Sequence, residues 1–532
     1  MSTFTLGIVF LAYFIILTYL GWLGYKNTKS SEDYLIGGRG MGSVIMSLSY
    51  GATFISASAI VGFGGVSATF GMGIQWLCFL NMFVGVVIAF IIFGKRTRSI
   101  GVQLGASSFP QFLGKFYKSK HIRIFVAAII ILGMPLYAAV VLKGGAVFIE
   151  QIFNVDYNIA LLIFTLVISA YVITGGMKGV MYTDALQAII MFICMAFLLV
   201  WFYKELGVGF TEGNRQLGEL SSMIPEGLKA QGHQGWTAMP SWGSPQWWTL
   251  VTSLILGVGI GCLAQPQLVV RFMTVKSNRQ LNRGVLIGCV FLMVTVGVIY
   301  HVGAMSNLYF MKTEGKITLD LVNDIDKIIP YFINHAMPDW FTAVFMMCII
   351  SAGMSTLSSQ FHTMGVAVGA DIYPLFGCSR RAAIKNNEIK DDTQEKASTK
   401  VVRVAVLVSI LASYGICYLL SANVIARGTS IFMGICAATF LPAYFCALYW
   451  KKVSRIAAIV SMWVGALSST FALLFLHEKE SASLGICNLL FGCDCLFPSF
   501  PLNMVDPIVW SFPLSCIAIF VVTLIAPNKS QE

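Results

Sequence analysis

The stretch Ser47-Leu-Ser-Tyr-Gly-Ala-Thr-Phe-Ile-Ser-Ala-Ser58, followed by Gly62, Gly64 and Gly65, decides how this chain can fold. It lies in a segment apolar enough to enter a membrane, yet hydroxyl and glycine residues occupy its middle. A glycine costs roughly 1 kcal/mol in a helix interior relative to alanine, so a continuous helix is disfavoured here. Backbone groups freed at a helix break find no partner in lipid and must line a cavity. We therefore predict a membrane helix that is interrupted within its span.

A second interrupted stretch has the same character. It reads Gly257-Val-Gly-Ile-Gly261 and then Ala264-Gln265-Pro266, where the proline removes a backbone donor. Close helix packing through small residues would explain either stretch alone. The two stretches lie five spans apart, at corresponding positions of two five-helix halves. Such a pair indicates an inverted-repeat transporter whose site lies at the bilayer midplane.

Composition places the chain in a membrane. Its mean hydropathy is +0.78 and only 11% of its 532 residues are charged, against roughly 25% in a soluble domain. About thirteen apolar segments are at or near the roughly 20 residues that cross the hydrocarbon core. We centre them near residues 15, 57, 85, 135, 165, 193, 258, 296, 355, 410, 438, 467 and 516. The first has no basic region before it and no cleavage site after it, so we expect a retained span and an all-α polytopic protein.

The net charge of +11 reflects orientation in the membrane rather than nucleic-acid binding. With thirteen spans and the N-terminus outside, 26 of the 35 Lys and Arg residues fall on cytoplasmic segments, eight fall outside and Lys143 falls within a span. This asymmetry follows the positive-inside rule. We expect a multi-pass cell-membrane protein with its N-terminus outside and its C-terminus cytoplasmic. A bacterial inner membrane is preferred, because we find no eukaryotic sorting signal or clear glycosylated loop.

A hydroxyl cluster marks the predicted span near residue 355. Residues 351–360 read Ser-Ala-Gly-Met-Ser-Thr-Leu-Ser-Ser-Gln, with four hydroxyls in five residues. A single buried hydroxyl can bond to the carbonyl one turn earlier in its own helix. Neutral oxygens on adjacent turns also suit a hard cation that has shed its water. This pattern indicates a sodium site.

Four motifs in the same order resemble those of the sodium/solute symporter family. They are Gly37-Gly38-Arg39, the run Thr174-Gly175-Gly176-Met-Lys-Gly-Val-Met-Tyr-Thr183-Asp184-Ala-Leu-Gln187, Gln265-Pro266 with Arg271-Phe-Met273, and Met-Ser-Thr-Leu-Ser-Ser at 354–359. The resemblance covers about residues 5–450. It implies thirteen transmembrane helices in a LeuT-like five-plus-five inverted repeat with broken helices at the midplane. It also implies that inward sodium movement is coupled to uptake of a small organic solute by alternating access.

On this basis we expect one membrane transport domain over residues 1–532. Its parts would be an extra N-terminal helix at 5–25, a first repeat at 44–205, a second repeat at 246–450 and two additional C-terminal helices at 456–526. Outside the membrane, an oxidising compartment could join two of Cys487, Cys493 and Cys495 and leave one free. Whether any pair forms stays open, because this spacing alone also fits unbonded thiols.

The resemblance implies a principal sodium site. Its ligands would be the carbonyl oxygens of Ala52, Ile55 and Ala352 and the hydroxyls of Ser355 and Thr356. Some family members resemble a second pattern, in which Asp184, Ser358 and Ser359 would hold a further sodium ion. A carboxylate inside a span is costly and by default functional, although Asp184 near a cytoplasmic end could also be solvated or pair with arginine. Arg39 would be a gate or an ion-pair partner.

The substrate is less well defined. In the proline branch of the family an aspartate and two tryptophans occupy positions that match Phe54, Ser58 and Val258, so proline itself is disfavoured. Candidate lining residues are Ser56, Ser58, Gln75, Asn81, Tyr137 and Gln265, each of which could instead bond between helices. Lys143 could snorkel to the interface. Alternatively it would offer its charge to a carboxylate, which makes an amino acid, a monocarboxylate or a related organic anion the expected solute.

Other classes of protein are less compatible with the sequence. We find no glycine loop for phosphates, no metal-spaced His/Cys/Glu set and no nucleophile motif in a suitable context, so we do not expect an enzyme. The expected partners are sodium as the co-transported ion, a small organic solute and the lipid bilayer, with no nucleic acid and no obligatory protein partner. A membrane sensor, or a proton-coupled or facilitative transporter on the same fold, stays an alternative.

Overall fold

The chain is almost wholly helical. The computed structural model describes residues 3–376, 398–420, 424–450 and 452–527, and in these ranges its regular segments are helices, apart from one isolated parallel bridge between Met41 and Val275. The longer segments are α1 (Thr3–Lys26), α3 (Ser43–Phe54), α4 (Ala57–Phe70), α5 (Gln75–Met82), η3 (Phe83–Gly94), α6 (Lys95–Gln103), α8 (Lys120–Phe153), α9 (Tyr157–Leu206), η5 (Thr249–Leu256), α13 (Gly257–Gly261), α14 (Pro266–Thr274), α15 (Asn278–Leu292), η7 (Met293–Gly297), α16 (Val298–Glu314), α19 (Asp339–Val366), η9 (Ala367–Ile372), α21 (Thr399–Cys417), α22 (Ile425–Tyr449), α23 (Arg455–Phe471) and α26 (Ile508–Ile525). The predicted all-α membrane fold is confirmed.

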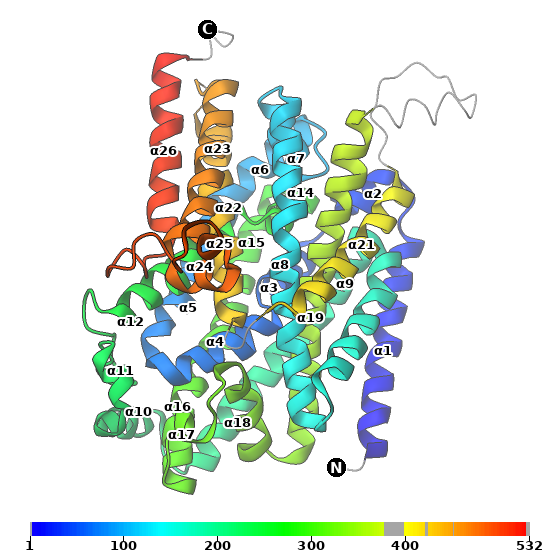
Figure 1. Cartoon of the computed structure of the whole chain (residues 1–532). Coiled ribbons are helices and arrows are strands. Elements are labelled where there is room, and N and C mark those ends of the chain that lie inside the picture. Colours follow the sequence, from blue (N-terminus) through cyan, green and yellow to red (C-terminus); the bar gives the residue numbers. More distant parts are fainter. Residues whose placement is uncertain (1–2, 377–397, 421–423, 451, 528–532) are drawn as a thin grey trace.

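Shorter helices connect these segments. They include α2 (Ser31–Ile36), η1 (Gly37–Arg39), α7 (Phe109–Phe116), α10 (Phe210–Glu219), α12 (Pro245–Trp248), η6 (Cys262–Ala264), α17 (Thr318–Leu321), η8 (Ile325–Lys327), α18 (Ile328–Ala336), α24 (Glu478–Leu484) and α25 (Ile486–Phe491). Figure 1 shows the start of α1 and the end of α26 at opposite ends of the molecule.

The predicted count of thirteen spans is not confirmed. Among the described residues, ten helical runs are long and apolar enough to cross a membrane, and Tyr157–Ser169 is a shorter apolar helix. One run, Ala57–Gln103, joins the second part of the span predicted near residue 57 to the span predicted near 85, because the chain turns at Gly71 (φ +78°) between contiguous helical segments. Similarly, α9 contains the predicted spans near 165 and 193, separated by a left-handed Gly176 (φ +58°).

Both predicted helix interruptions are present. Helix α3 ends at Phe54, Ile55 and Ser56 are extended, and α4 begins at Ala57. In the second stretch Gln265 is extended (φ −69°, ψ 118°) between η6 and α14, which begins with Pro266 as the sequence predicts. The two breaks are neighbours: a Cβ on Gly85 of η3 would lie 3.0 Å from the Phe54 ring and 3.3 Å from Cys262 Sγ.

The helices around the first break are in direct contact. Helix α19 packs against α3, α8 and α9, and α4 packs against α8 and α22. The hairpin formed by α17, η8 and α18 covers the far end of α4, where a Cβ on Gly65 would lie 2.0 Å from the Ile325 carbonyl oxygen. Only glycine permits this approach. The hairpin thus covers the part of α4 that leads away from the break.

Two sequence predictions about the periphery stay predictions. The proposed division into repeats at 44–205 and 246–450, with flanking helices at 5–25 and 456–526, is compatible with the helix bounds but is not tested by them. Cys487 and Cys493 lie with their sulfur atoms 4.0 Å apart and are not bonded. The charged segment 377–397 lies outside the described residues.

Candidate functional site

The end of α3 and the middle of α19 meet through hydroxyl groups. Ser355 Oγ donates to the Ala52 carbonyl oxygen (2.8 Å) and lies 3.1 Å from the Ala352 carbonyl oxygen. Thr356 Oγ1 lies 3.0 Å from the carbonyl oxygen of Thr53 and 3.5 Å from that of Ala52. Both hydroxyl side chains are fully buried. Four of the five sequence-predicted sodium ligands are therefore brought together.

The helix break explains why these carbonyls are available. The last four carbonyl groups of a helix have no partner within it, and Ile55 and Ser56 leave the helix before those of α3 can be satisfied. Ile55, the fifth predicted ligand, stands at the break with φ −92° and ψ 102°. The structure therefore places neutral oxygens from two separate helices around one point, which suits a monovalent cation.

A second polar cluster lies one turn further along α19. Ser49 Oγ donates to Asp184 Oδ2 at 2.9 Å, Thr53 Oγ1 lies 3.3 Å from the same oxygen, and Ser358 Oγ lies 3.5 Å from Asp184 Oδ1. Ser359 Oγ lies 3.1 Å from Thr53 Oγ1. The sequence-predicted second set, Asp184, Ser358 and Ser359, is thus assembled together with Ser49 and Thr53.

A guanidinium group occupies this second cluster. Arg271 of α14 is fully buried, and its Nη2 atom donates to Asp184 Oδ2 (2.8 Å) and to Ser359 Oγ (2.6 Å). Arg271 Nε donates to Ser49 Oγ at 3.0 Å, and Arg271 also contacts the Thr53 hydroxyl. A cation that belongs to the protein therefore stands where a second sodium ion was predicted.

The sequence left open that Asp184 pairs with an arginine, but it did not show which arginine. That partner is Arg271, which stands six residues after Gln265 on the short helix that follows the second break. The pairing depends on α9 and α14 both packing against α3, which no local pattern reveals.

Four hydroxyl groups gather at the start of α4. Ser56 Oγ and Ser58 Oγ are 2.6 Å apart, and Ser58 Oγ is 2.9 Å from Thr429 Oγ1 of α22. Tyr137 of α8 is buried beside Ser56, and its ring lies 5.8 Å from that of Phe432. Ser56, Ser58 and Tyr137, all predicted to line the substrate site, are therefore brought together, and α22 adds two residues that were not predicted.

The remaining uncharged candidates are more dispersed. Gln265 is buried at the second break, and its Nε2 atom has no hydrogen-bond partner among the described residues. Asn81 of α5 is buried, with no partner for its Oδ1 atom in the same part of the chain. Gln75 Nε2 instead donates to the Gly297 carbonyl oxygen (3.0 Å), and this residue is half-buried. The structure does not bring Gln75 to the hydroxyl cluster.

Lys143 faces the hairpin that covers α4. Its Nζ atom donates to the Leu420 carbonyl oxygen (3.3 Å), and it lies in the electrostatic environment of Asp326 and Asp324. Burial and the neighbouring Asp324 carboxylate raise the pKa of Asp326 to about 6, while Lys143 acts in the opposite direction. Lys143 thus bonds to the segment that follows α21, and its proposed role toward a substrate carboxylate stays a prediction.

The raised pKa of Asp326 predicts a pH-dependent stability. Between about pH 4 and pH 6 the folded state binds this proton more tightly than the unfolded state, so stability should fall as pH rises through that window. We expect Asp326→Asn to flatten the dependence of melting temperature on pH, and Lys143→Met to steepen it. Asp320→Asn, at an exposed position of the same hairpin, is the matched control. Parallel melting curves for Asp326→Asn and wild type would contradict this assignment.

Arg39 forms ion-pair and backbone contacts at the opposite end of the molecule from this hairpin. Its Nε atom lies 2.6 Å from Glu32 Oε1, and its Nη2 atom donates to the Ala106 carbonyl oxygen at 2.9 Å. Lys178 makes a neighbouring ion pair with Asp33 at 2.6 Å. The ion-pair alternative predicted for Arg39 matches these contacts.

A pair of interrupted helices, one of which presents its free carbonyl groups to a hydroxyl-bearing helix, defines a LeuT-fold secondary transporter. The fold of a Na+-coupled sialic acid symporter in a substrate-bound outward-open state is similar, with a TM-score of 0.76, 17% identity and 99% of both chains covered. A nucleobase-cation-symport-1 family transporter in a closed conformation is also similar, with a TM-score of 0.51, 11% identity and coverage of 92% of this chain and 93% of that one.

The chain belongs to the sodium:solute symporter family, whose model matches residues 34–465. Curated relatives include the osmoregulated proline transporter OpuE of Bacillus subtilis (strain 168), 26% identical over 508 residues, which are 94% of this chain and 93% of the relative. A sodium/proline symporter of Staphylococcus aureus (strain JH9) is 26% identical over 509 residues, which are 94% of this chain and 90% of the relative. The protein is therefore a multi-pass membrane transporter that couples solute uptake to sodium, the co-transported ion.

Proposed function

We propose that this symporter carries a small organic solute with a carboxylate group, such as an amino acid or a monocarboxylate, and binds it at the start of α4. The observation that supports this proposal is the buried N-terminal end of the half-helix α4, which no side chain caps. Helix α4 begins at Ala57 after Ser56, and no side chain caps its first N–H groups. Such an end has a positive dipole and donates backbone hydrogen bonds, so it favours an anionic group.

The surroundings of this helix end support the proposal. Ser56, Ser58, Tyr137 and Thr429 supply hydroxyl donors there. Helix α8 approaches closely, since a Cβ on Gly144 would lie 3.4 Å from the Ser58 nitrogen. Polar groups and a helix terminus that converge at a membrane midplane match the way in which anionic substrate groups are held by inverted-repeat transporters.

The neighbouring carbonyl groups support a shared site for ion and solute. We propose that the principal sodium ion is held by Ala52, Ile55, Ala352, Ser355 and Thr356. Ile55 stands two residues before Ala57, where α4 and the proposed carboxylate site begin. The negative C-terminal end of α3 favours the cation, and the positive N-terminal end of α4 favours the anion. One helix break would therefore bind both partners, and each would increase the affinity for the other.

The relatives named as proline transporters support an amino acid as one member of this class. Proline itself is disfavoured, because Phe54, Ser58 and Val258 stand where the proline branch has an aspartate and tryptophans. We further propose that the N-terminus faces outside and the C-terminus faces the cytoplasm of a bacterial cell. This orientation is supported by the distribution of Lys and Arg residues.

Uptake into proteoliposomes tests the substrate class. Labelled amino acids, monocarboxylates, vitamins and sugars are offered with and without an inward sodium gradient. We expect accumulation of a carboxylate-bearing member, and a rise of about tenfold in its half-saturating concentration for Ser58→Ala, as for loss of one hydrogen bond to a charged group. Ser461→Ala is the matched control, since it removes a buried hydroxyl that bonds to Ser515 between peripheral helices. Accumulation of an uncharged sugar alone would contradict the proposal.

A further inference from the structure

We propose that Tyr13, on the N-terminal helix α1, is a positioning residue that sets the sodium affinity of the symporter. The inference rests on the sodium site proposed above. Helix α1 precedes both predicted repeats and contributes none of the proposed ligands. It nevertheless packs along α9, and its Tyr13 side chain is 4% exposed. A tyrosine hydroxyl buried within a membrane needs a partner, and the identity of that partner gives Tyr13 its role.

The Tyr13 hydroxyl bonds to the helix that carries the sodium ligands. It lies 2.8 Å from Ser351 Oγ, and Gln187 Nε2 of α9 donates to it at 3.5 Å. Ser351 directly precedes Ala352 and lies one turn before Ser355. Gln187 lies three residues after Asp184. One hydroxyl thus links α19, which bears three of the five proposed sodium ligands, to α9, which bears Asp184.

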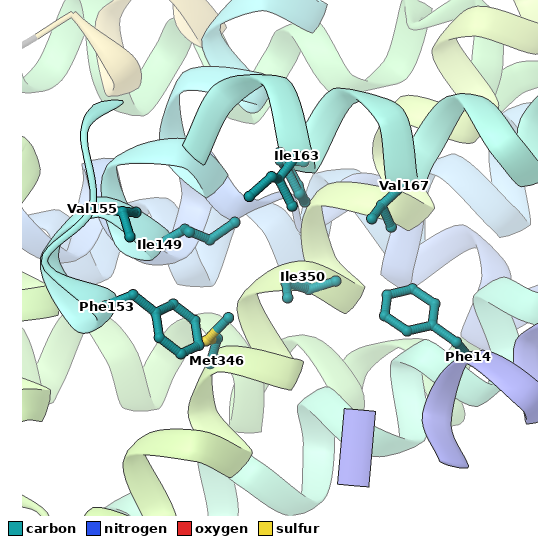
Figure 2. A pocket seen from close by; sticks show the side chains of 9 residues that line it. Phe14, Ile149, Phe153, Val155, Ile163, Val167, Met346 and Ile350 are labelled. Atoms are coloured by element: carbon teal, nitrogen blue, oxygen red, sulfur yellow. The ribbon is translucent and has the colours of Figure 1, made fainter. Parts of the chain in front are cut away.

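An apolar crevice lies beside this hydrogen bond. Phe14 and Ile350, the chain neighbours of Tyr13 and Ser351, line this crevice of about 420 Å³ between α1, α8, α9 and α19, and Figure 2 shows them on its walls. Phe153 and Ile163 on the same walls are 41% and 48% exposed, so the crevice opens to the outer face of the helices. The Tyr13–Ser351 hydrogen bond is therefore a polar link between α1 and α19 beside an apolar face.

Helix α1 is also anchored at a distance from Tyr13. A Cβ on Gly24 would lie 2.3 Å from the Gly179 Cα atom, so α1 and α9 cross in backbone contact there. Lys178 Nζ donates to the Asn27 carbonyl oxygen at 2.9 Å. Because these contacts do not involve Tyr13, Tyr13→Phe should leave α1 in place and remove only the bonds of the hydroxyl to Ser351 and Gln187.

Binding of radioactive sodium to the purified full-length protein tests the inference. We expect Tyr13→Phe to raise the half-saturating sodium concentration by about threefold to tenfold, the range for one interhelical hydrogen bond in a membrane. Ser351→Ala removes the same bond from the other side and should have a similar effect. The double variant should have about the same half-saturating sodium concentration as Tyr13→Phe alone, because Ser351→Ala removes a bond that Tyr13→Phe already removes. Tyr19→Phe, at an exposed position of α1, is the matched control and should equal wild type.

The sodium-binding measurements distinguish a failure of the proposed role of Tyr13 from a failure of the proposed sodium site. A wild-type protein without saturable sodium binding would overturn the proposed site, and the role of Tyr13 with it. Saturable binding in wild type with an unchanged half-saturating concentration in both Tyr13→Phe and Ser351→Ala would overturn only the role of Tyr13. A reduced number of sites at unchanged affinity would overturn it as well, because that result marks a purely structural residue.

Discussion

Sodium-driven uptake should fall by about tenfold to a hundredfold when Ser355→Ala or Thr356→Val removes one hydroxyl from the junction of α3 and α19. Ser355 Oγ lies 2.8 Å from the Ala52 carbonyl oxygen, and Thr356 Oγ1 lies 3.0 Å from the Thr53 carbonyl oxygen. A bond from a neutral group to a charge contributes about 1.5–3 kcal/mol, and each 1.4 kcal/mol is a factor of ten. The loss should appear as a higher half-saturating sodium concentration, measured by initial uptake rates over a sodium series.

Ser413→Ala provides the matched control for this prediction. Ser413 is a fully buried serine of α21 whose hydroxyl donates to the Ser409 carbonyl oxygen (2.9 Å), so the variant removes a comparable hydroxyl far from the helix break. It should transport as wild type does. Unchanged sodium dependence in both Ser355→Ala and Thr356→Val would refute the assignment of these hydroxyls as ligands. Their role would then be only to form hydrogen bonds between α19 and α3.

Arg271→Met should destabilise the protein by about 3–5 kcal/mol, because it leaves the Asp184 carboxylate buried without its cation. Both side chains of this ion pair are fully buried, with 2.8 Å between Arg271 Nη2 and Asp184 Oδ2. Asp184→Asn should lower the stability by a similar amount, since it leaves the buried Arg271 guanidinium without a carboxylate partner. The double variant should recover much of the lost stability, as expected for two groups that act as one pair. Thermal unfolding in detergent measures these differences.

The effect of sodium concentration on melting temperature should distinguish the Arg271–Asp184 pair from an ion pair with a purely structural role. The guanidinium stands among Asp184, Thr53 and Ser359, where the sequence predicts a second sodium ion. High sodium should therefore raise the melting temperature of Arg271→Met more than that of wild type, because the ion can replace the missing charge. The wild-type protein should bind one sodium ion as long as the Arg271 guanidinium contacts Asp184 and Ser359.

Arg279→Met is the control for the Arg271 experiments, since it removes an exposed arginine of the neighbouring helix α15. Equal melting temperatures for Arg271→Met and Arg279→Met would show that the buried pair contributes nothing. Two sodium ions bound to the wild-type protein in the arrangement seen here would contradict the exclusion of the second ion by Arg271.

Local residue chemistry was sufficient to predict the class of protein and the position of its helix breaks. Ser47–Ser58 and Gly257–Pro266 combine apolar character with residues that weaken helices, and a membrane offers few ways to satisfy the backbone groups that this frees. The hydroxyl cluster at 355–359 likewise needed no neighbour to indicate a cation. The number of spans was harder to predict, because Gly71 lies inside a single helical run, Ala57–Gln103, and the apolar helix before Gly176, Tyr157–Ser169, is short.

Contacts between segments distant in the chain decided the rest. Arg271 lies 87 residues from Asp184 in the sequence, and Tyr13 lies 338 residues from Ser351, yet each pair is joined by a buried hydrogen bond. Lys143, for which the sequence left open a position at the interface or a contact with a carboxylate, donates to the Leu420 carbonyl oxygen, 277 residues away in the chain. Hydropathy and local motifs depend on near neighbours in the chain, and so they predict helices, their breaks and the kinds of ligand atom. The partner of a buried charge or hydroxyl depends on which helices pack together, and only the tertiary structure specifies that.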